Sequence, residues 1–151
     1  MLKMKNFTIE HIINDNYGAY KRKGWNHYKC RLRYHIIFST KYRKKCLTDI
    51  KQQVFDAFNY CNNRSEFNIV NMNLDKDHIH FYVEIPPTIS IGQCVNRMKA
   101  ISTNYLWDRY SLYLSRFYWG KKRKLWTHGY FCSSIGLVSE QIVWNYINNQ
   151  S

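Results

Sequence analysis

The stretch YKCRLRYHIIF, residues 28–38, alternates between two kinds of side chain. One set is apolar and consists of Cys30, Leu32, Tyr34, Ile36 and Phe38. The other set is mainly basic and consists of Lys29, Arg31, Arg33, His35 and Ile37. A period of two is typical of a β-strand that is buried on one face. We therefore expect a strand with one face toward a core and one basic face.

The segments that follow change between helical and extended patterns. Thr48 is suited to cap a helix, because Ile50, Val54, Phe58 and Cys61 then recur at helical spacing. Pro86-Pro87 ends an extended run, since proline cannot donate to a sheet. The predicted elements are a helix from Thr48 to Cys61, strands at 67–74 and 78–85, a helix from Ser90 to about Trp107, a loop or broken helix at 109–127, a strand at 130–135 and a helix from Ser139.

This order, β-α-β-β-α-β with a terminal helix, is that of an α+β, ferredoxin-like split βαβ sheet. Its helices cover one face of an antiparallel sheet and leave the other face open. The first and third strands are central neighbours, and the fourth strand lies at an edge. With 151 residues the chain is long enough for one domain, which we place at 28–151. Residues 1–27 form an N-terminal extension of unknown role.

Charge indicates the class of partner. Lys and Arg number 23 against 10 Asp and Glu, a formal net charge of +13, which favours a nucleic acid. A hydrophobic content of 45% excludes a disordered basic tail. Neither a membrane-spanning apolar run nor a signal peptide is recognisable, and the five cysteines form no CxxC pair. These features predict a protein of the reducing cytoplasm.

The strongest local signal is Asp77-His78-Ile79-His80-Phe81. His78 and His80 share one face of a strand, so two imidazoles lie side by side as half of a metal site. The alternative is a pair of solvated surface histidines. Residues of the first strand would flank the pair, where their cations suit a phosphate or keep the open face soluble: Arg31, Arg33 and His35.

Other candidates come later in the chain. Tyr146 and Gln150 are four apart on the last predicted helix, so a nucleophilic phenol and a cation-binding amide share one side. A core tyrosine beside a frayed helix end is the alternative. The run Lys121, Lys122, Arg123 and Lys124 either contacts DNA or is a solvated loop. Stacking on bases or packing within the protein is expected of four aromatic residues: Tyr105, Trp107, Tyr118 and Trp119.

Taken together, these residues resemble the single-tyrosine HUH transposases of small prokaryotic insertion sequences, the TnpA type. The resemblance runs from about Tyr28 to Gln150. The matching stretches are Tyr34-His35-Ile36-Ile37 with Lys41-Tyr42-Arg43-Lys44, then Asp77-His78-Ile79-His80, then Leu125-Trp126 with Gly129-Tyr130-Phe131, and finally Gly136-Leu137-Val138-Ser139-Glu140 continuing to Tyr146-Ile147-Asn148-Asn149-Gln150.

The resemblance implies a role for each matched residue. His78 and His80 would be the histidines of the HUH motif, Gln150 the third ligand of Mg²⁺ or Mn²⁺, and Tyr146 the nucleophile. Such an enzyme recognises hairpins at element ends and cuts and rejoins single-stranded DNA through a 5′-phosphotyrosine. The family works as a homodimer with sites assembled in trans, in the prokaryotic cytoplasm near the nucleoid. Two departures are the longer lead-in of residues 1–27 and a chain that stops one residue after Gln150.

The uncharged stretch Tyr130–Ile135 independently suggests a dimer joined at the fourth strand, because an exposed sheet edge invites pairing. Rival hypotheses for the function are a non-catalytic nucleic-acid module on the same fold, a domesticated hairpin-DNA-binding protein and a rolling-circle initiator. The first lacks the expected aromatic signature on the third strand. The second is disfavoured by the presence of all four site residues, and the third by the short chain.

Overall fold

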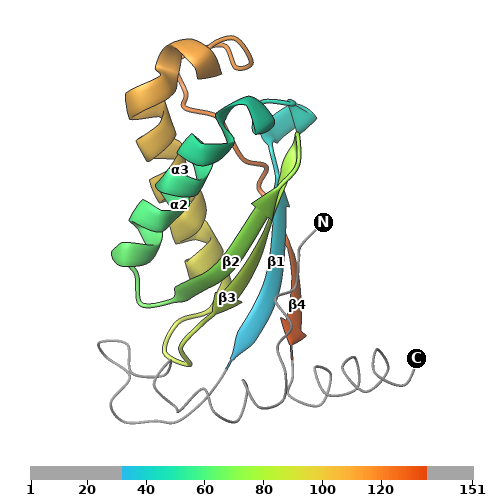
Figure 1. Cartoon of the computed structure of the whole chain (residues 1–151), viewed down its shortest axis with the longest axis vertical. Coiled ribbons are helices and arrows are strands. Elements are labelled where there is room, and N and C mark those ends of the chain that lie inside the picture. Colours follow the sequence, from blue (N-terminus) through green and yellow to red (C-terminus); the bar gives the residue numbers. More distant parts are fainter. Residues whose placement is uncertain (1–31, 136–151) are drawn as a thin grey trace, which may run out of the picture.

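The computed structural model describes residues 32–135 of the chain. Its elements are β1 (Arg33–Ser39), two short 3₁₀ turns (Lys41–Arg43 and Thr48–Ile50), α2 (Lys51–Asn63), β2 (Asn68–Leu74), β3 (His78–Glu84), α3 (Ile91–Leu114) and β4 (Phe131–Ile135). The strands form one antiparallel sheet in the order β2-β3-β1-β4, and α2 and α3 lie against one side of it (Figure 1). The predicted α+β, ferredoxin-like arrangement is therefore confirmed, with β1 and β3 central. The predicted terminal helix lies outside the described residues.

The two helices start for different reasons. Ser90 caps α3 as expected: its side chain accepts a hydrogen bond from the Gln93 amide, and the Gln93 side chain accepts one from the Ser90 amide. The prediction that Thr48 caps the first helix is wrong. Thr48 lies within a 3₁₀ turn, and α2 begins after Ile50 with no side-chain cap. Burial of Leu47 and Ile50 sets this start instead, because the turn between them must face the core.

The helix α3 is longer than predicted. It continues past Trp107 to Leu114, with a local kink at Tyr110, where φ is −129° and ψ is 34°. Leu114 is fully buried, and the Tyr113 hydroxyl donates to the Cys46 carbonyl at 2.7 Å. These tertiary contacts extend the helix through a segment whose sequence pattern is weak.

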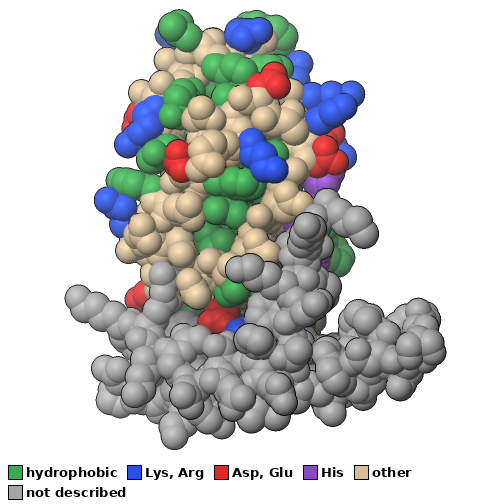
Figure 2. Space-filling view, in the orientation of Figure 1, with side chains coloured by type: hydrophobic (Ala, Val, Ile, Leu, Met, Phe, Trp, Pro, Cys, Tyr) green, Lys and Arg blue, Asp and Glu red, His purple; other side chains and the backbone are tan. Residues whose placement is uncertain are grey.

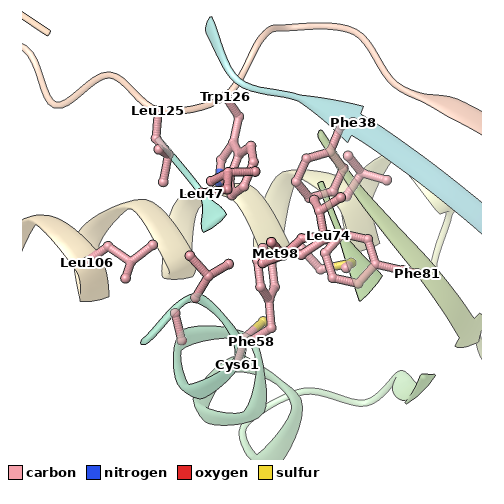
Figure 3. Packing of buried hydrophobic residues seen from close by; sticks show 14 of the residues in the cluster. Phe38, Leu47, Phe58, Cys61, Leu74, Phe81, Met98, Leu106, Leu125 and Trp126 are labelled. Atoms are coloured by element: carbon pink, nitrogen blue, oxygen red, sulfur yellow. The ribbon is translucent and has the colours of Figure 1, made fainter. Parts of the chain in front are cut away.

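The core lies between the sheet and the helices. Its centre is an aromatic cluster from β1, β3, α2 and the segment before β4 (Figure 3). Ring centroids of Phe58 and Phe81 are 4.6 Å apart, and those of Phe38 and Trp126 are 4.9 Å apart. The indole N–H of Trp126 donates to the buried Ser102 hydroxyl at 2.9 Å, which satisfies its polar group.

The segment between α3 and β4 is held against the rest of the fold. The Trp107 indole N–H donates to the Lys124 carbonyl, and the Tyr118 hydroxyl donates to the carbonyls of Lys41 and Leu125. The Lys99 ammonium donates to the carbonyls of Thr127 and Gly129. Trp107 and Tyr118 therefore pack within the protein, and burial raises the pKa of Tyr118. Within residues 32–135 neither helix has the length and apolar character that crossing a membrane requires.

The two edges of the sheet differ. The β2 amides of Ile69, Met72 and Leu74 donate hydrogen bonds to asparagine side chains, which belong to Asn62 at the end of α2 and to Asn71 and Asn73 of β2 itself. Amides that are already bonded in this way are poor templates for another strand. The opposite edge is β4, with the sequence FCSSI and no charged residue.

Candidate active site

The side of the sheet opposite α2 and α3, called the open face below, carries the polar residues of β3. Ile79, Phe81 and Val83 are fully buried in the core, whereas His78 and His80 are half-buried on the open face. This is the predicted alternation. The strand register places Ser39 opposite His78, Ile37 opposite His80 and His35 opposite Tyr82.

His35 completes a row of three imidazoles. Its Nε2 lies 3.2 Å from Nδ1 of His80, and the two rings stack with centroids 5.4 Å apart. The rings of His80 and His78 meet edge to face with centroids 5.1 Å apart. The predicted neighbourhood of His35 and the histidine pair is therefore present in the structure.

Asp77 joins the row at its other end. Its Oδ1 is 2.8 Å from Nδ1 of His78, and its Oδ2 accepts from Nε of Arg43 at 3.1 Å. The hydrogen bond with His78, supported by Arg43, holds the pKa of Asp77 below its usual range. The sequence alone assigned no role to Asp77 or Arg43, although both occur in the quoted motifs.

These contacts determine which ring nitrogens can bind a cation. Nδ1 of His78 contacts Asp77, and Nδ1 of His80 contacts His35. Within the described residues, Nε2 of neither histidine makes a hydrogen bond. Burial lowers the pKa of His80, and the charges of His78 and His35 add to the effect. His80 is therefore favoured as a neutral imidazole with a lone pair, which is the form that binds metals.

Arg33 differs from expectation. It lies on the open face but is only 4% exposed, and its Nη2 is 2.6 Å from Oε1 of the equally buried Glu84. Its guanidinium also lies over the Tyr82 ring at 5.5 Å. Burial opposes the charge of Arg33, but Glu84 and Tyr82 outweigh it and raise the pKa of Arg33. The arginine is thus committed to a buried ion pair, which leaves it neither a solvating cation nor a ready phosphate contact.

The basic run lies along a groove. A cavity of about 580 Å³ is lined by α3 and residues 122–128, with Lys41, Lys99, Lys122 and Lys124 among its cations. Arg123 is held to α3, where its Nη2 is 2.6 Å from Oδ1 of Asp108. Lys121 and Lys122 are exposed. The run is therefore anchored to a groove wall and is not a free loop.

Three predicted site residues, Arg31, Tyr146 and Gln150, lie outside the described residues. Within 32–135, no group of three or more His, Cys, Asp or Glu side chains is placed to share a metal ion.

By its fold and its site, this chain is an α+β protein with a histidine pair on the open face of an antiparallel sheet. A family model for IS200-like transposases matches residues 28–150. The transposase for insertion sequence element IS200 from Salmonella typhimurium is 25% identical over 130 residues, covering 85% of this chain and 82% of the relative. The Salmonella typhi transposase of the same description gives the same values. The chain belongs to the IS200-like transposase family.

Two solved structures share the fold. The crystal structure of a candidate transposase from Deinococcus radiodurans superposes with a TM-score of 0.65 at 23% identity, covering 85% of this chain and 97% of that one. A REP-associated tyrosine transposase bound to a REP hairpin gives a TM-score of 0.53 at 15% identity, covering 83% and 70%. Both support the architecture described above.

Proposed function

We propose that this chain cuts and rejoins single-stranded DNA at the ends of an insertion sequence through a 5′-phosphotyrosine on Tyr146. The observation that carries the proposal is the histidine pair on the open face. Asp77 and His35 occupy the Nδ1 atoms of His78 and His80, which leaves the Nε2 atoms for a cation. Membership of a transposase family supports the same conclusion.

The donor set fits a divalent metal. His78 and His80 would supply two neutral imidazole nitrogens and Gln150 an amide oxygen, a mixture that accepts Mn²⁺ or Mg²⁺ and leaves positions for water and phosphate oxygens. When bound, the ion would polarise the scissile phosphate. The Asp77 carboxylate accepts from Nδ1–H of His78, so this ring presents Nε2. The ring of His80 presents Nε2 in the tautomer in which its Nδ1–H donates to Nε2 of His35.

The tyrosine step exchanges one phosphoester bond of the DNA for another on the protein. The phenolic oxygen of Tyr146 attacks the phosphorus, the bond from phosphorus to the 3′-oxygen breaks, and the phenolic proton is lost as that oxygen becomes a hydroxyl. A 3′-hydroxyl from the same or another strand then attacks the phosphotyrosine and restores a phosphodiester. One phosphoester replaces another at each step, so the reaction needs no ATP, and the sequence contains no P-loop.

Hairpin DNA is the proposed partner. The net charge of +13 and the groove lined by Lys122 and Lys124 suit a phosphate backbone. The structural relative bound to a REP hairpin supports this choice of DNA shape. We place the activity in the prokaryotic cytoplasm at the nucleoid, in a single domain over 28–151.

We further propose a homodimer joined through β4, with each site assembled in trans. The support is the contrast between the two edges: asparagine side chains occupy outward amides of β2, and β4 carries no charge. Mixing inactive Tyr146→Phe with inactive His78→Ala tests the assignment. In the trans arrangement the mixed dimer regains one working site. A dead mixture, with subunit exchange shown independently, contradicts it.

Covalent trapping tests the function itself. The probe is a set of labelled single-stranded oligonucleotides that cover the DNA flanking the gene, with Mg²⁺ or Mn²⁺ added. We expect a protein–DNA adduct that carries the 5′ end of the cut strand and that disappears in Tyr146→Phe. Binding of a hairpin without any adduct would instead identify a hairpin-binding protein that no longer cuts DNA.

A further inference from the structure

Two aromatic rings stand exposed where β1 meets the segment after α3. Tyr42 is 64% exposed and Trp119 is 71% exposed. The segments that carry them lie side by side, because the Lys41 amide donates to the Leu125 carbonyl at 2.8 Å and the Tyr118 hydroxyl donates to the Lys41 carbonyl at 3.0 Å. Figure 2 shows Lys and Arg side chains beside hydrophobic ones at the upper end of the molecule, where Figure 1 places the residues after α3.

The turn that presents Tyr42 has an unfavourable backbone. Tyr42 has φ 60° and Arg43 has φ 54°, so two consecutive residues with side chains are in the left-handed region. Such strain persists where surrounding contacts fix it, and it clusters at functional sites. Here the Thr40 hydroxyl donates to the Lys44 carbonyl across the turn, and Arg43 reaches back to Asp77. The consequence is that the exposed Tyr42 ring stands next to an Arg43 guanidinium that is itself exposed and contacts Asp77.

Both rings stay largely exposed although lysine ammonium groups lie over them. The ammonium groups of Lys41 and Lys124 lie 5.6 and 5.9 Å from the Tyr42 centroid, and that of Lys44 lies 5.1 Å from the Trp119 centroid. Lys41 and Lys124 also line the groove beside α3. Exposed rings with lysines close by match what single-stranded nucleic acid requires, since bases stack on the rings while the cations bind phosphates.

Another aromatic pair on the surface shows the contrast. Tyr60 and Tyr105 lie on α2 and α3 with ring centroids 5.1 Å apart. Arg64 lies 3.6 Å from the Tyr60 centroid, and Arg109 lies 3.6 Å from the Tyr105 centroid. Arginines of the protein itself therefore sandwich this pair, which makes it a clamp between two helices. Within residues 32–135, no cation lies that close to Tyr42 or Trp119.

We propose that Tyr42 and Trp119 form a stacking platform for an unpaired base of the DNA strand, with Lys41, Lys44 and Lys124 binding its phosphates. This inference rests on the proposed single-strand activity and adds a binding site to it. Asp77 connects the platform to the histidine pair, because it contacts both Arg43 and His78. The platform therefore lies next to the turn that contacts the histidine pair.

The test compares fluorescein-labelled oligothymidine as a single strand with the same strand in a duplex. Removing either ring, in Trp119→Ala or in Tyr42→Asn, should weaken single-strand binding about tenfold with little effect on duplex binding. Asparagine tolerates the left-handed backbone at position 42. Trp119→Phe and Tyr42→Phe keep a ring and should retain most of the affinity. Leu112→Ala is the control, because Leu112 is 87% exposed and lies outside the platform.

Tryptophan emission gives a second readout that a purely structural role would not move. Oligothymidine should quench the emission of the parent protein, and Trp119→Phe should lose that part of the quenching while still binding. Unchanged single-strand affinity in Trp119→Ala and Tyr42→Asn, or an equal loss for single strand and duplex, would overturn the platform. If the parent protein still forms its covalent adduct in that case, the proposed function stands. A parent protein that binds neither probe contradicts both proposals.

Discussion

The two faces of the sheet use the same strands for opposite purposes. On β3, Ile79 and Phe81 are fully buried against the helices, while His78 and His80 on the other side are half-buried and contact one another. Alternate residues of one strand therefore stabilise the core on one face and form the candidate site on the other. The rigid core face holds the imidazoles in register, and the open face leaves them accessible to a ligand.

The open face is itself divided along β1. At one end, Arg33 and Glu84 form a buried ion pair. Two residues further along β1, His35 meets His80, and beyond the strand Arg43 meets Asp77. Residues of similar polarity thus act as a fixed structural pair in one place and as a candidate binding site in the other. Burial and the partners that each side chain finds make the difference.

The largest expected effect comes from the open face. Replacing both histidines, His78→Ala with His80→Ala, should abolish strand cleavage, because two proposed metal ligands are lost. Hairpin binding and the thermal midpoint should change little, since neither ring belongs to the core. Gel cleavage assays and fluorescence anisotropy measure the two effects. Full cleavage by the double variant in Mg²⁺ would remove the metal assignment and erase the contrast between the faces.

The matching change on the core face should act on stability. Phe81→Ala removes a ring that packs 4.6 Å from Phe58 and 5.0 Å from Phe38. A loss of about 3–5 kcal/mol in the free energy of unfolding is expected, measured by urea denaturation. Phe131→Ala is the control, because Phe131 is 56% exposed on β4 and its loss should cost about 0.5 kcal/mol or less. Equal losses in the two variants would contradict the assignment of faces.

A smaller effect tests how the open face holds its ligands. His35→Phe keeps an aromatic ring but removes the nitrogen that contacts His80, so Mn²⁺ affinity should fall about 10- to 100-fold. His35→Gln should recover part of the loss, because its amide oxygen can accept from Nδ1 of His80. Mn²⁺ paramagnetic resonance measures free ion directly. His128→Phe, at an exposed histidine, should have no effect; a similar loss there would show that His35 has no special role.

The smallest effect concerns the basic groove. Removing Lys121, Lys122, Arg123 and Lys124 together should flatten the salt dependence of DNA binding by up to ~0.7 log unit per lost single-strand phosphate contact. The structure refines this prediction: Lys122→Ala should reduce the slope more than Arg123→Ala, because Arg123 is already paired with Asp108. Titrations of anisotropy against salt measure both slopes. An unchanged slope in the fourfold variant would mean that the groove does not contact phosphate.

The periodicity of the sequence and its capping residues were sufficient to predict much of the fold. The period of two in residues 28–38 and in His78–Ile85 located the central strands and their two faces. Ser90 correctly marked the start of α3. Thr48 failed as a cap because burial of Leu47 and Ile50 governs that turn. The kinked continuation of α3 to Leu114 agrees with the broken-helix alternative for 109–127, but its end was not predicted, since it depends on contacts with distant residues such as Cys46.

Periodicity and local spacing in the sequence were enough to predict the succession of strands and helices, the two faces of each central strand and the shared face of His78 and His80, while the spatial strand order followed from the fold that this succession matches. Tertiary structure alone decided which polar residues meet across strands. It placed His35 against His80, tied Arg43 to Asp77, buried Arg33 with Glu84 and left Tyr42 and Trp119 exposed. Such pairings depend on register, on turn geometry and on the removal of water, which arise only when residues far apart in the chain pack together.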